Sequence, residues 1–415
     1  MKNRKLIFHI DFDSYFVSAH RSTNIFLKHK PVAVSHKPSN SIVSSISYEL
    51  KNKKVKVGTP KYLVERVEPD TIFVEPDFNL YITLSNKIFE YIAKVFSKNI
   101  EVYSIDECWL DVTEETKDLN VFAFAREIQQ KILFEYDIPV SIGISHTKWL
   151  AKMATGLKKP FGINYIDTFE DVKNTIYPLP IEEYFGIGKS LAAKLKKVGI
   201  NTIGDLATSS LTNPDLYKIF RSRLKSYIDD PNGEGSDKLT YEHNELKGIG
   251  NEVTFSAGAL DNRHDIYATL KMLANKVALR AQNRTKVAKT ISIVVRSVEK
   301  AWKSKQHILE MPTNDEAVFY DKAVDLFESV WKEEPIKGIG IRLTNLISEF
   351  DVFRQLTIFE DDLPQQPSKN KVDNIIDKVN KKLHKKALKT GYQVLRENTA
   401  KGIQSRYIQD DLKKS

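Results

Sequence analysis

Three acidic residues of this 415-residue sequence stand where buried strands should end. Asp11 closes the apolar run LIFHI, and Asp106 and Glu107 lie between the apolar stretches 100–105 and 108–112. A carboxylate at the end of a buried strand is costly unless a cation or solvent accompanies it. Three carboxylates brought together by folding could hold two divalent cations about 4 Å apart, an arrangement that suits in-line phosphoryl transfer. Hard oxygen ligands of this kind favour Mg²⁺.

Each part of this pattern also has an ordinary explanation. An aspartate that precedes a helix is commonly its N-cap, and we favour this interpretation for Asp13, with Ser14 as the alternative cap. An acidic pair in a turn is commonly solvated. The adjacent aromatics Tyr15 and Phe16 could be core residues on one helix face, and isolated lysines are commonly exposed. The combination of two acidic motifs, each flanked by strand residues, favours a metal site.

The elements that must position these residues form an α+β pattern. Apolar periodicity predicts strands at 6–11, 31–37, 41–47, 100–105, 108–112 and 139–144, and helices at 79–96 and 122–136. A lysine-bearing helix that ends near Gly156 follows the last strand. This order is typical of a split β-α-β layout, one antiparallel sheet with its helices on one face. The first strand and the 100–112 hairpin are neighbours in such a sheet, which would bring the carboxylates to one edge.

The second half of the sequence changes in texture. Short helices are predicted from about residue 169, and a polar stretch at 229–237 is typical of a linker. A second strand-rich unit then shows strands at 291–298, 308–311 and 338–347 and helices at 266–283 and 314–331. The segments KGIGNEVTF and GIGIRLTNL at its two ends suit edge strands. From residue 361 on, the tail has thirteen Lys or Arg against seven Asp or Glu, which suits a helix on DNA or on a partner, or a solvated segment.

Composition sets broad limits on the class of protein. The length and the 41% hydrophobic share indicate a soluble protein with several cores. The formal charge of +9 suits a partner with phosphates, and equally a basic protein without one. The single cysteine, Cys108, excludes an intrachain disulfide, suits a reducing cytoplasm, and is expected to pack as a small apolar residue. No apolar run approaches a membrane span, so we expect no membrane association.

The chain resembles the Y-family DNA polymerases, the lesion-bypass enzymes, in the order and spacing of HIDFDSYFVS, SYELK, VYSIDECWLDV, VSIGISHTKWLAKMAT, KKPFGI and FGIGKSLAAKLKKVGI. The likeness covers about the first 350 residues and is closer to the bacterial UmuC- and DinB-like members. It implies a multidomain α+β right-hand polymerase with a ferredoxin-like palm, small fingers, a helical thumb with a helix-hairpin-helix, and an α+β little finger. The implied boundaries are 1–14 and 81–168 for the palm, 15–80 for the fingers, 169–236 for the thumb, 237–246 for a linker, 247–349 for the little finger, and 350–415 for a clamp-binding motif and basic tail.

The resemblance implies a role for each acidic residue. Asp11, Asp106 and Glu107 would be the catalytic ligands of two Mg²⁺ ions. The main-chain carbonyl of Phe12 would complete one of the two metal sites. Asp13 has no ligand role in the family pattern, which agrees with a capping role.

The resemblance also implies a nucleotide site. Phe16 would be the steric gate, because its ring would collide with the 2′-hydroxyl of a ribonucleotide, and Tyr15 would pack beside it. The triphosphate would be held by Ser45, Tyr48, Lys51 and Lys159. Hydroxyls and cations suit this role because they neutralise phosphate charge. The family usually has arginine at the position of Lys51, and lysine cannot grip two phosphate oxygens at once.

Two further regions are expected to contact DNA. Gly186 and Gly188 would let the backbone of the helix-hairpin-helix approach a phosphate, with Lys189 as an added cation. Arg296 and Arg342 of the little finger are expected phosphate contacts, although exposed strand residues would look the same. Contacts of this kind position DNA without reading its sequence.

A short segment after the last domain resembles the peptide by which bacterial polymerases dock on the β-type sliding clamp. Its residues are Gln355, Leu356, Ile358 and Phe359, within QLTIF. The glutamine would supply amide hydrogen bonds, and the apolar side chains would fill pockets. A chance match to an apolar patch is the alternative.

The resemblance implies template-directed, error-prone translesion synthesis by two-metal transfer of a nucleotide from dNTP to a primer 3′-hydroxyl. The enzyme would act in the DNA damage response as a cytoplasmic monomer on primer-template DNA. Two other interpretations remain open from the residues. One is a nucleotide cyclase or phosphodiesterase on a similar palm, which would need neither the helix-hairpin-helix nor the second strand-rich unit. The other is a non-catalytic DNA- and clamp-binding protein, which would need no complete set of carboxylates.

Overall fold

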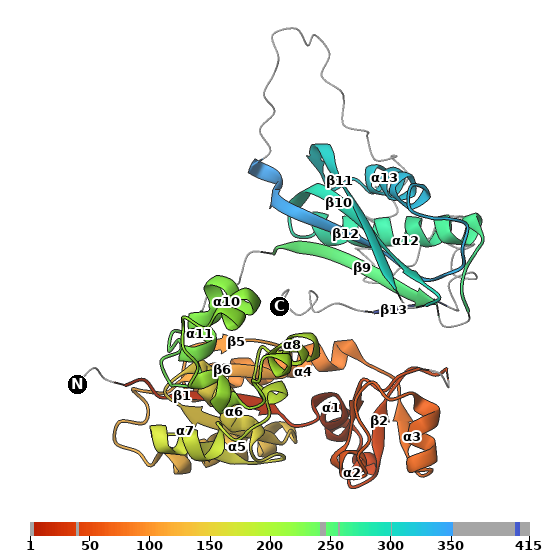
Figure 1. The fold of residues 1–415 in the computed structure, drawn as a ribbon. Helices are drawn as coiled ribbons and strands as arrows, with labels where there is room; N and C mark the ends of the chain where they lie inside the picture. Colours follow the sequence, from red (N-terminus) through yellow and green to blue (C-terminus); the bar gives the residue numbers. More distant parts are fainter. Residues whose placement is uncertain are drawn as a thin grey trace. The chain divides into compact units, whose positions relative to one another are not determined.

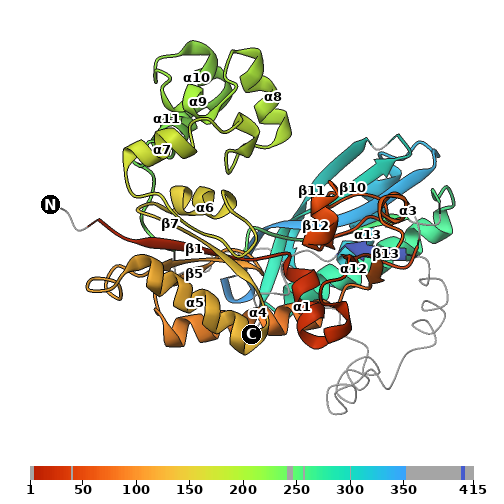
Figure 2. The same ribbon diagram turned by 90° about the horizontal axis from the view of Figure 1, so that it is seen from below.

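The computed structural model describes residues 4–38, 41–240, 246–255, 258–299 and 301–351, and the backbone of a strand at 403–406. The chain divides between residues 243 and 244 into two compact units (Figures 1 and 2). No helix of this described part is long and apolar enough to span a membrane. The four residues of the predicted clamp-binding motif, Gln355, Leu356, Ile358 and Phe359, lie outside the described residues.

The first unit is built on a five-stranded sheet of order β5-β6-β1-β7-β8. Its strands are β1 (Ile7–Phe12), β5 (Ile100–Val102), β6 (Glu107–Asp111), β7 (Val140–Ser145) and β8 (Ile163–Tyr165). The first strand pairs antiparallel with both β6 and β7, so the predicted neighbourhood of the first strand and the hairpin is confirmed. The three-residue β8, which the sequence did not reveal, runs parallel to β7.

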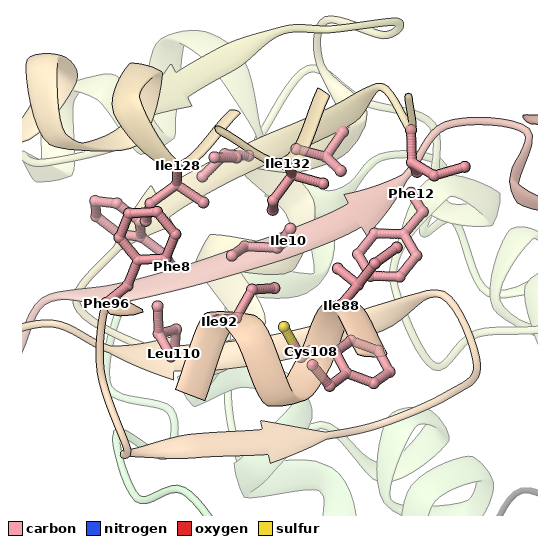
Figure 3. Close-up of a cluster of buried hydrophobic side chains, with 14 of the residues drawn as sticks. Phe8, Ile10, Phe12, Ile88, Ile92, Phe96, Cys108, Leu110, Ile128 and Ile132 are labelled. Carbon is pink, nitrogen blue, oxygen red and sulfur yellow. The ribbon is translucent and has the colours of Figure 1, made fainter. Parts of the chain in front are cut away.

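Side chains of β1 alternate between two faces of this sheet, as the pleat requires. Phe8, Ile10 and Phe12 pack against α4 (Phe78–Val95) and α5 (Val121–Tyr136), and Figure 3 shows this core. The residues between them therefore face the opposite side, where α6 (Lys148–Gly156) lies (Figure 2). The prediction of helices on one face is thus wrong for α6.

The reason α6 can lie so close to the sheet is a glycine. A Cβ at Gly143 of β7 would lie 2.0 Å from the carbonyl oxygen of Ala151 and 2.3 Å from the backbone nitrogen of Thr155. No side chain fits there, so the helix backbone rests directly on the strand. This approach brings α6 residues over the face that carries Asp11.

Polar residues fix where α4, α5 and α6, the three helices that pack on this sheet, begin. The carboxylate of Asp77 accepts a hydrogen bond from the Leu80 amide (3.0 Å) at the start of α4. The side chain of Asn120 caps α5 in the same way. The hydroxyl of Thr147 accepts from the first turn of α6. Each cap satisfies a backbone donor that the helix leaves unpaired, which explains why the predicted and observed boundaries agree closely.

Two smaller subdomains complete the first unit. One holds a three-stranded sheet of order β3-β2-β4 with three helices and a 3₁₀ turn: β2 (Val32–Val34), β3 (Ser45–Ile46), β4 (Ile72–Val74), α1 (Tyr15–Thr23), η1 (Ile25–Leu27), α2 (Tyr48–Asn52) and α3 (Lys61–Val67). The other is helical: α7 (Phe169–Thr175), η2 (Ile181–Glu183), α8 (Lys189–Lys197), α9 (Ile203–Ala207), α10 (Pro214–Phe220), η3 (Arg221–Arg223) and α11 (Leu224–Asp229). Its core includes Trp149, Leu150 and Met153 of α6, so α6 packs on both the sheet and the helical subdomain.

The described part of the predicted linker lies against the first unit. Leu239 is buried with Ile7 and Trp109. The Thr240 amide donates to the carboxylate of Glu101 (2.7 Å). The described part of this segment therefore packs on the sheet through the side chain of Leu239.

The second unit is a five-stranded antiparallel sheet of order β11-β10-β12-β9-β13 with two helices. Its elements are β9 (Gly248–Phe255), α12 (Arg263–Gln282), β10 (Lys286–Ser297), β11 (Trp302–Thr313), α13 (Glu316–Glu328), β12 (Ile336–Ser348), η4 (Glu349–Asp351) and β13 (Ile403–Arg406). Alternate residues of β10, among them Ile291 and Ile293, form one core with both helices. The prediction that the terminal segments are edge strands is wrong, because β12 lies between β10 and β9, and β9 pairs on its other side with β13.

Candidate active site

The strand register brings the three predicted carboxylates to one end of the sheet. Asp11 lies directly opposite Glu107 in the β1–β6 pair, so both side chains are on the α6 face. The backbone amide of Phe12 donates to the carbonyl oxygen of Asp106 (2.9 Å), which fixes the residue before β6 beside the end of β1. Residues almost one hundred positions apart are thereby neighbours.

Each carboxylate has a different partner. The ammonium group of Lys159 forms an ion pair with Asp11, and that of Lys152 forms one with Glu107. No ion pair with Asp106 is formed by the described residues, and its carboxylate instead accepts a hydrogen bond from the Ser104 hydroxyl (2.6 Å). Within the described ranges, no group of three or more Asp, Glu, His or Cys side chains is arranged as a ready-made metal centre.

These surroundings separate the acidities of the two adjacent carboxyl groups. Burial, together with the negative charges of Asp11 and Glu107, raises the pKa of Asp106 to about 6, against the opposing Ser104 hydrogen bond. Burial alone would also raise the pKa of Glu107. The hydrogen bond with His9 and the charge of Lys152 outweigh it and lower the pKa of Glu107 to about 2. Glu107 therefore loses its proton more readily than Asp106.

A cavity of about 270 Å³ opens beside Asp11 and Asp106. Its walls are Asp11, Phe12, Ser14, Tyr15, Phe16, Ser44, Ser45, Ile46, Tyr48, Lys51, Val57, Asp106 and Lys159. All six residues predicted to bind the nucleotide line it, together with three of the four predicted to hold metal. The exception is Glu107, which is not among the lining residues.

The ring of Phe16 is backed by a rigid aromatic group. It stacks on Tyr81 with ring centroids 4.2 Å apart and planes 8° apart. The Tyr81 hydroxyl lies 2.8 Å from His20 Nε2, and its carbonyl oxygen accepts from the Tyr15 hydroxyl (2.5 Å). Tyr15 itself is buried beside Phe16, so it packs where the resemblance implied.

Two lysines from different elements meet at the same cavity. The ammonium group of Lys51 lies 4.2 Å above the ring of Tyr48. Burial, and next the nearby charge of Lys159, lower the pKa of Lys51. Asp11 and Asp13 oppose this effect. Two ammonium groups that line one cavity form a site that attracts a polyanion.

Asp13 does not cap the following helix. The residue before α1 is Ser14, at φ 46°, and its side chain makes no capping hydrogen bond. The carboxylate of Asp13 points instead into the protein, where it accepts from Tyr48, Ser141 and the Phe161 amide. The capping interpretation of Asp13 is therefore wrong. The alternative is right in position, because Ser14 is the N-cap residue of α1, but its side chain makes no capping hydrogen bond.

Two residues that hold Glu107 were not predicted from the sequence. His9 is 1% exposed, with Nε2 3.3 Å from the Glu107 carboxylate and Nδ1 2.8 Å from the Thr155 hydroxyl. Lys152 lies over the rings of Tyr103 and Phe185. A signal for His9 existed, because residues two apart on a strand share a face and His9 precedes Asp11 by two.

The predicted helix-hairpin-helix has an open backbone. Gly186 has φ +108°, a conformation that side chains rarely adopt, and no atom lies within 4 Å of a Cβ placed at Gly186 or Gly188. Gly188 is the N-cap residue of α8, and the exposed Lys189 begins that helix. Ile187 between the glycines is buried and anchors the turn. The geometry leaves room for a phosphate at the amides.

The two predicted arginines of the second unit lie on its helix-free sheet face. Arg342 is exposed and pairs across the strands with Ser292, which stands four residues before Arg296 on β10. Of the residues between Ser292 and Arg296, Ile293 and Val295 face the helices, whereas Val294 shares the helix-free face. The guanidinium of Arg296 is half-buried and lies 5.6 Å from the ring centroid of Trp302. Only Arg342 is therefore freely offered to a ligand.

Three family models match most of this chain. The impB/mucB/samB family matches residues 10–156, the C-terminal domain of that family residues 246–358, and the IMS family HHH motif residues 170–200. DNA polymerase IV of Bacillus velezensis is 30% identical over 401 residues, which covers 95% of this chain and 94% of the relative. DNA polymerase IV 1 of Bacillus subtilis is 31% identical with the same coverage.

Solved structures of similar fold are also polymerases. A Y-family DNA polymerase chimera of Dbh and Dpo4 has a TM-score of 0.72 at 27% identity, over 83% of this chain and 99% of that chain. An insertion ternary complex of Dbh DNA polymerase has a TM-score of 0.55 at 26% identity, with the same coverage. DinB from Sulfolobus solfataricus has a TM-score of 0.52 at 27% identity. The predicted polymerase fold is confirmed.

The matches decide between the interpretations that the residues left open. They extend over the helix-hairpin-helix and the second unit, which a nucleotide cyclase would not need, and the relatives are named as enzymes and not as binding proteins. The chain therefore belongs to the Y-family of DNA polymerases, on its DinB-like branch, and is a DNA-directed DNA polymerase.

Proposed function

We propose that this polymerase performs error-prone translesion synthesis, adding nucleotides from dNTPs to the 3′-hydroxyl of a primer by a two-metal route. The observation that carries the proposal is the single cavity that Asp11, Asp106, Phe16, Lys51 and Lys159 share. Acidic groups, cations and an aromatic ring are the three kinds of group that a metal–triphosphate–sugar ligand needs. The solved relatives include a Dbh insertion ternary complex, which supports a nucleotide in this position.

The donor set fits two Mg²⁺ ions, with Asp11, Asp106, Glu107 and the carbonyl of Phe12 as ligands. All four donors are hard oxygens. Asp106 lines the cavity with Asp11, and the negative charges of Asp11 and Glu107 add to burial in raising its pKa, an effect that a divalent ion would offset. Bound at these residues, the ions would favour the ionised primer hydroxyl and stabilise the pyrophosphate that leaves.

Lys159, Lys51, Ser45 and Tyr48 are proposed to hold the triphosphate. Lys159 forms its ion pair with Asp11 from the loop after α6, and both residues line the cavity. A cation in this place can exchange one anionic oxygen for another when a nucleotide enters. Together with Lys51 it would neutralise charge that builds on the phosphates in the transition state.

DNA is proposed to bind at both units, at Gly186, Gly188 and Lys189 in the first and at Arg342 with Arg296 in the second. Open glycine amides and an exposed lysine suit a phosphate. The helix-free sheet face suits a duplex because its side chains are not covered by the helices of its own unit. Docking on the β-type sliding clamp is proposed from the sequence QLTIF alone.

Primer extension by the Asp106→Ala variant tests the proposal. With Mg²⁺ and damaged or undamaged templates, we expect extension to fall by about three orders of magnitude or more, because metal ions contribute several kcal/mol to such transition states. Binding of Mn²⁺, followed by its paramagnetic resonance, should weaken in parallel. Asp111→Asn is the matched control, since Asp111 stands at the other end of β6 and pairs with Lys5 (2.9 Å). Extension retained by Asp106→Ala would refute the metal assignment.

A further inference from the structure

Asp13 is a buried carboxylate that the proposed chemistry does not use. It is 1% exposed. Its Oδ1 accepts from the Tyr48 hydroxyl (3.1 Å), and its Oδ2 accepts from the Phe161 amide (2.8 Å). The Ser141 hydroxyl, which has one hydrogen to donate, lies within hydrogen-bond distance of both oxygens, 3.0 Å from Oδ1 and 2.8 Å from Oδ2. Both oxygens are thus fully engaged by uncharged donors.

The three donors come from three separate parts of the first unit. Tyr48 begins α2 in the small α/β subdomain. Ser141 is on β7 of the large sheet, opposite Asp11 of β1. Phe161 follows the proposed triphosphate ligand Lys159 by two residues. One carboxylate therefore joins the subdomain that carries Tyr48 to the loop that carries Lys159.

The backbone of Asp13 is itself held firmly. Its amide donates to the carbonyl oxygen of Pro139 (2.9 Å), and its own carbonyl accepts from the Ser18 hydroxyl (2.6 Å). The carboxylate is consequently a fixed point and does not adapt to its donors. Groups that donate to it are placed relative to β1, and so relative to Asp11.

We propose that Asp13 is a positioning residue for nucleotide binding, one that sets the separation of Tyr48 and Lys159 so that both meet the triphosphate at once. It acts through these two residues and does not touch the nucleotide. The inference rests on the proposed function, because it takes Tyr48 and Lys159 as triphosphate ligands. A side chain with two accepting oxygens is needed here, because Tyr48 donates to Oδ1 and the Phe161 amide donates to Oδ2.

The decisive measurement is dNTP affinity of the enzyme–DNA complex with Ca²⁺ in place of Mg²⁺, which reports binding without chemistry. Asp13→Asn keeps the size of the side chain and loses one accepting oxygen. We expect its dNTP dissociation constant to rise about tenfold, the effect of one lost hydrogen bond to a charged group. Affinity for primer-template DNA should stay within about twofold, since one tenfold step is the whole expected effect.

A second pair of variants guards against misfolding of Asp13→Asn. Ser141→Ala removes one donor to Asp13 and should weaken dNTP binding by about threefold, at the low end for a neutral hydrogen bond. Ser145→Ala is the matched control, because Ser145 is equally buried on β7 but donates to the Ile166 carbonyl (2.8 Å). It should leave dNTP affinity unchanged. Equal effects of the two serine variants would overturn the inference.

Combination with Lys159→Ala separates positioning from general destabilisation. If Asp13 acts through Lys159, Asp13→Asn should weaken dNTP binding much less in the Lys159→Ala background than in the parent. Fully additive effects would overturn the inference, as would unchanged dNTP affinity of Asp13→Asn when Lys159→Ala weakens it. If Lys159→Ala itself has no effect on dNTP affinity, the proposed triphosphate site fails and the inference fails with it.

Discussion

At the scale of single residues, chemistry depends on which side chains stand behind those that face the cavity. Phe16 faces the cavity, and Tyr81 stacked behind it prevents its ring from retreating. Glu107 is held in its ionised form by His9 and Lys152. The residues that would act directly are thus placed by others that carry no chemistry of their own.

Selection against ribonucleotides is expected to depend on the ring of Phe16. Phe16→Ala removes the surface that a 2′-hydroxyl would strike, so ribonucleotide insertion should rise relative to deoxyribonucleotide insertion by at least about tenfold. Single-nucleotide insertion with dCTP and CTP opposite template G measures the ratio. Tyr15→Phe serves as control, because it removes only the hydroxyl that is bound to Tyr81. An unchanged sugar preference in Phe16→Ala would disprove the gate.

The sequence could predict the residues that we propose to act directly, but not the residues behind them. Asp11, Asp106 and Glu107 stand out because acidic residues interrupt strand patterns. His9 looks like any polar residue in a strand until β6 and α6 place Glu107 and Thr155 beside it. Asp13 likewise resembles a cap, because a local pattern cannot show that Ser141, 128 residues away, will donate to it.

At the scale of elements, the site depends on how closely α6 approaches the sheet. Lys152 of α6 pairs with Glu107, and Lys159 follows the end of the helix. The close contact at Gly143 sets the height of the helix above β7. A change in that height would move both ammonium groups together.

Gly143→Ala is therefore expected to damage both stability and activity. The added Cβ would meet backbone atoms of Ala151 and Thr155, which cannot rotate away, so the free energy of unfolding should fall by about 3 kcal/mol. Urea denaturation followed by circular dichroism measures it. Gly156→Ala, at the end of α6, is the control, because no atom lies within 4 Å of the new Cβ. It should change stability by less than about 0.5 kcal/mol, and an equal loss in both variants would contradict the argument.

The end of α11 carries a pH-dependent charge. Burial raises the pKa of Asp230 to about 6, with a smaller contribution from Asp229, although the Tyr184 hydroxyl donates to it (3.4 Å). The folded protein thus binds this proton more tightly than the unfolded chain, and stability is lost as the pH rises through about 6. A negative charge at a helix C-terminus is also unfavourable because it lies at the negative end of the helix dipole.

Asp230→Asn should remove this loss. The free energy of unfolding should rise at pH 7.5 by about 1 kcal/mol, allowing for screening by solvent, and the gain should vanish near pH 4.5. Denaturation curves at the two pH values test the sign. Asp229→Asn is the control, since Asp229 pairs with Lys225 (2.6 Å) and its loss should not stabilise the protein. A gain for Asp230→Asn that persists at pH 4.5 would contradict this origin.

Element boundaries were predictable where one face is buried and failed where it is not. β1, β6 and β7 carry regularly placed apolar residues, and their predicted ends lie within about two residues of the observed ends. β11 was predicted as a four-residue strand but spans Trp302–Thr313, because its first half, WKSKQH, is exposed throughout and carries no alternation.

At the scale of the whole molecule, basic residues on each of the two units are proposed to contact DNA. Lys189→Ala in the first unit and Arg342→Ala in the second should each weaken binding to all sequences about equally. Each should also lower the slope of log affinity against log salt by about one. Fluorescence anisotropy at several salt concentrations measures both effects. Lys196→Ala is the control on the same helix, because Lys196 already pairs with Glu182. An equal salt effect for Lys196→Ala would contradict the assignment of Lys189.

The burial of Cys108 has a practical consequence. It is the sole cysteine of the chain, it is fully enclosed, and burial raises its pKa, so its sulfur stays protonated and out of reach of thiol reagents. Maleimide dyes should therefore not label Cys108 in the unaltered enzyme. One introduced cysteine on each unit would take a donor and an acceptor fluorophore, and energy transfer between them would report, in real time, any change in the distance between the two labels during a catalytic cycle.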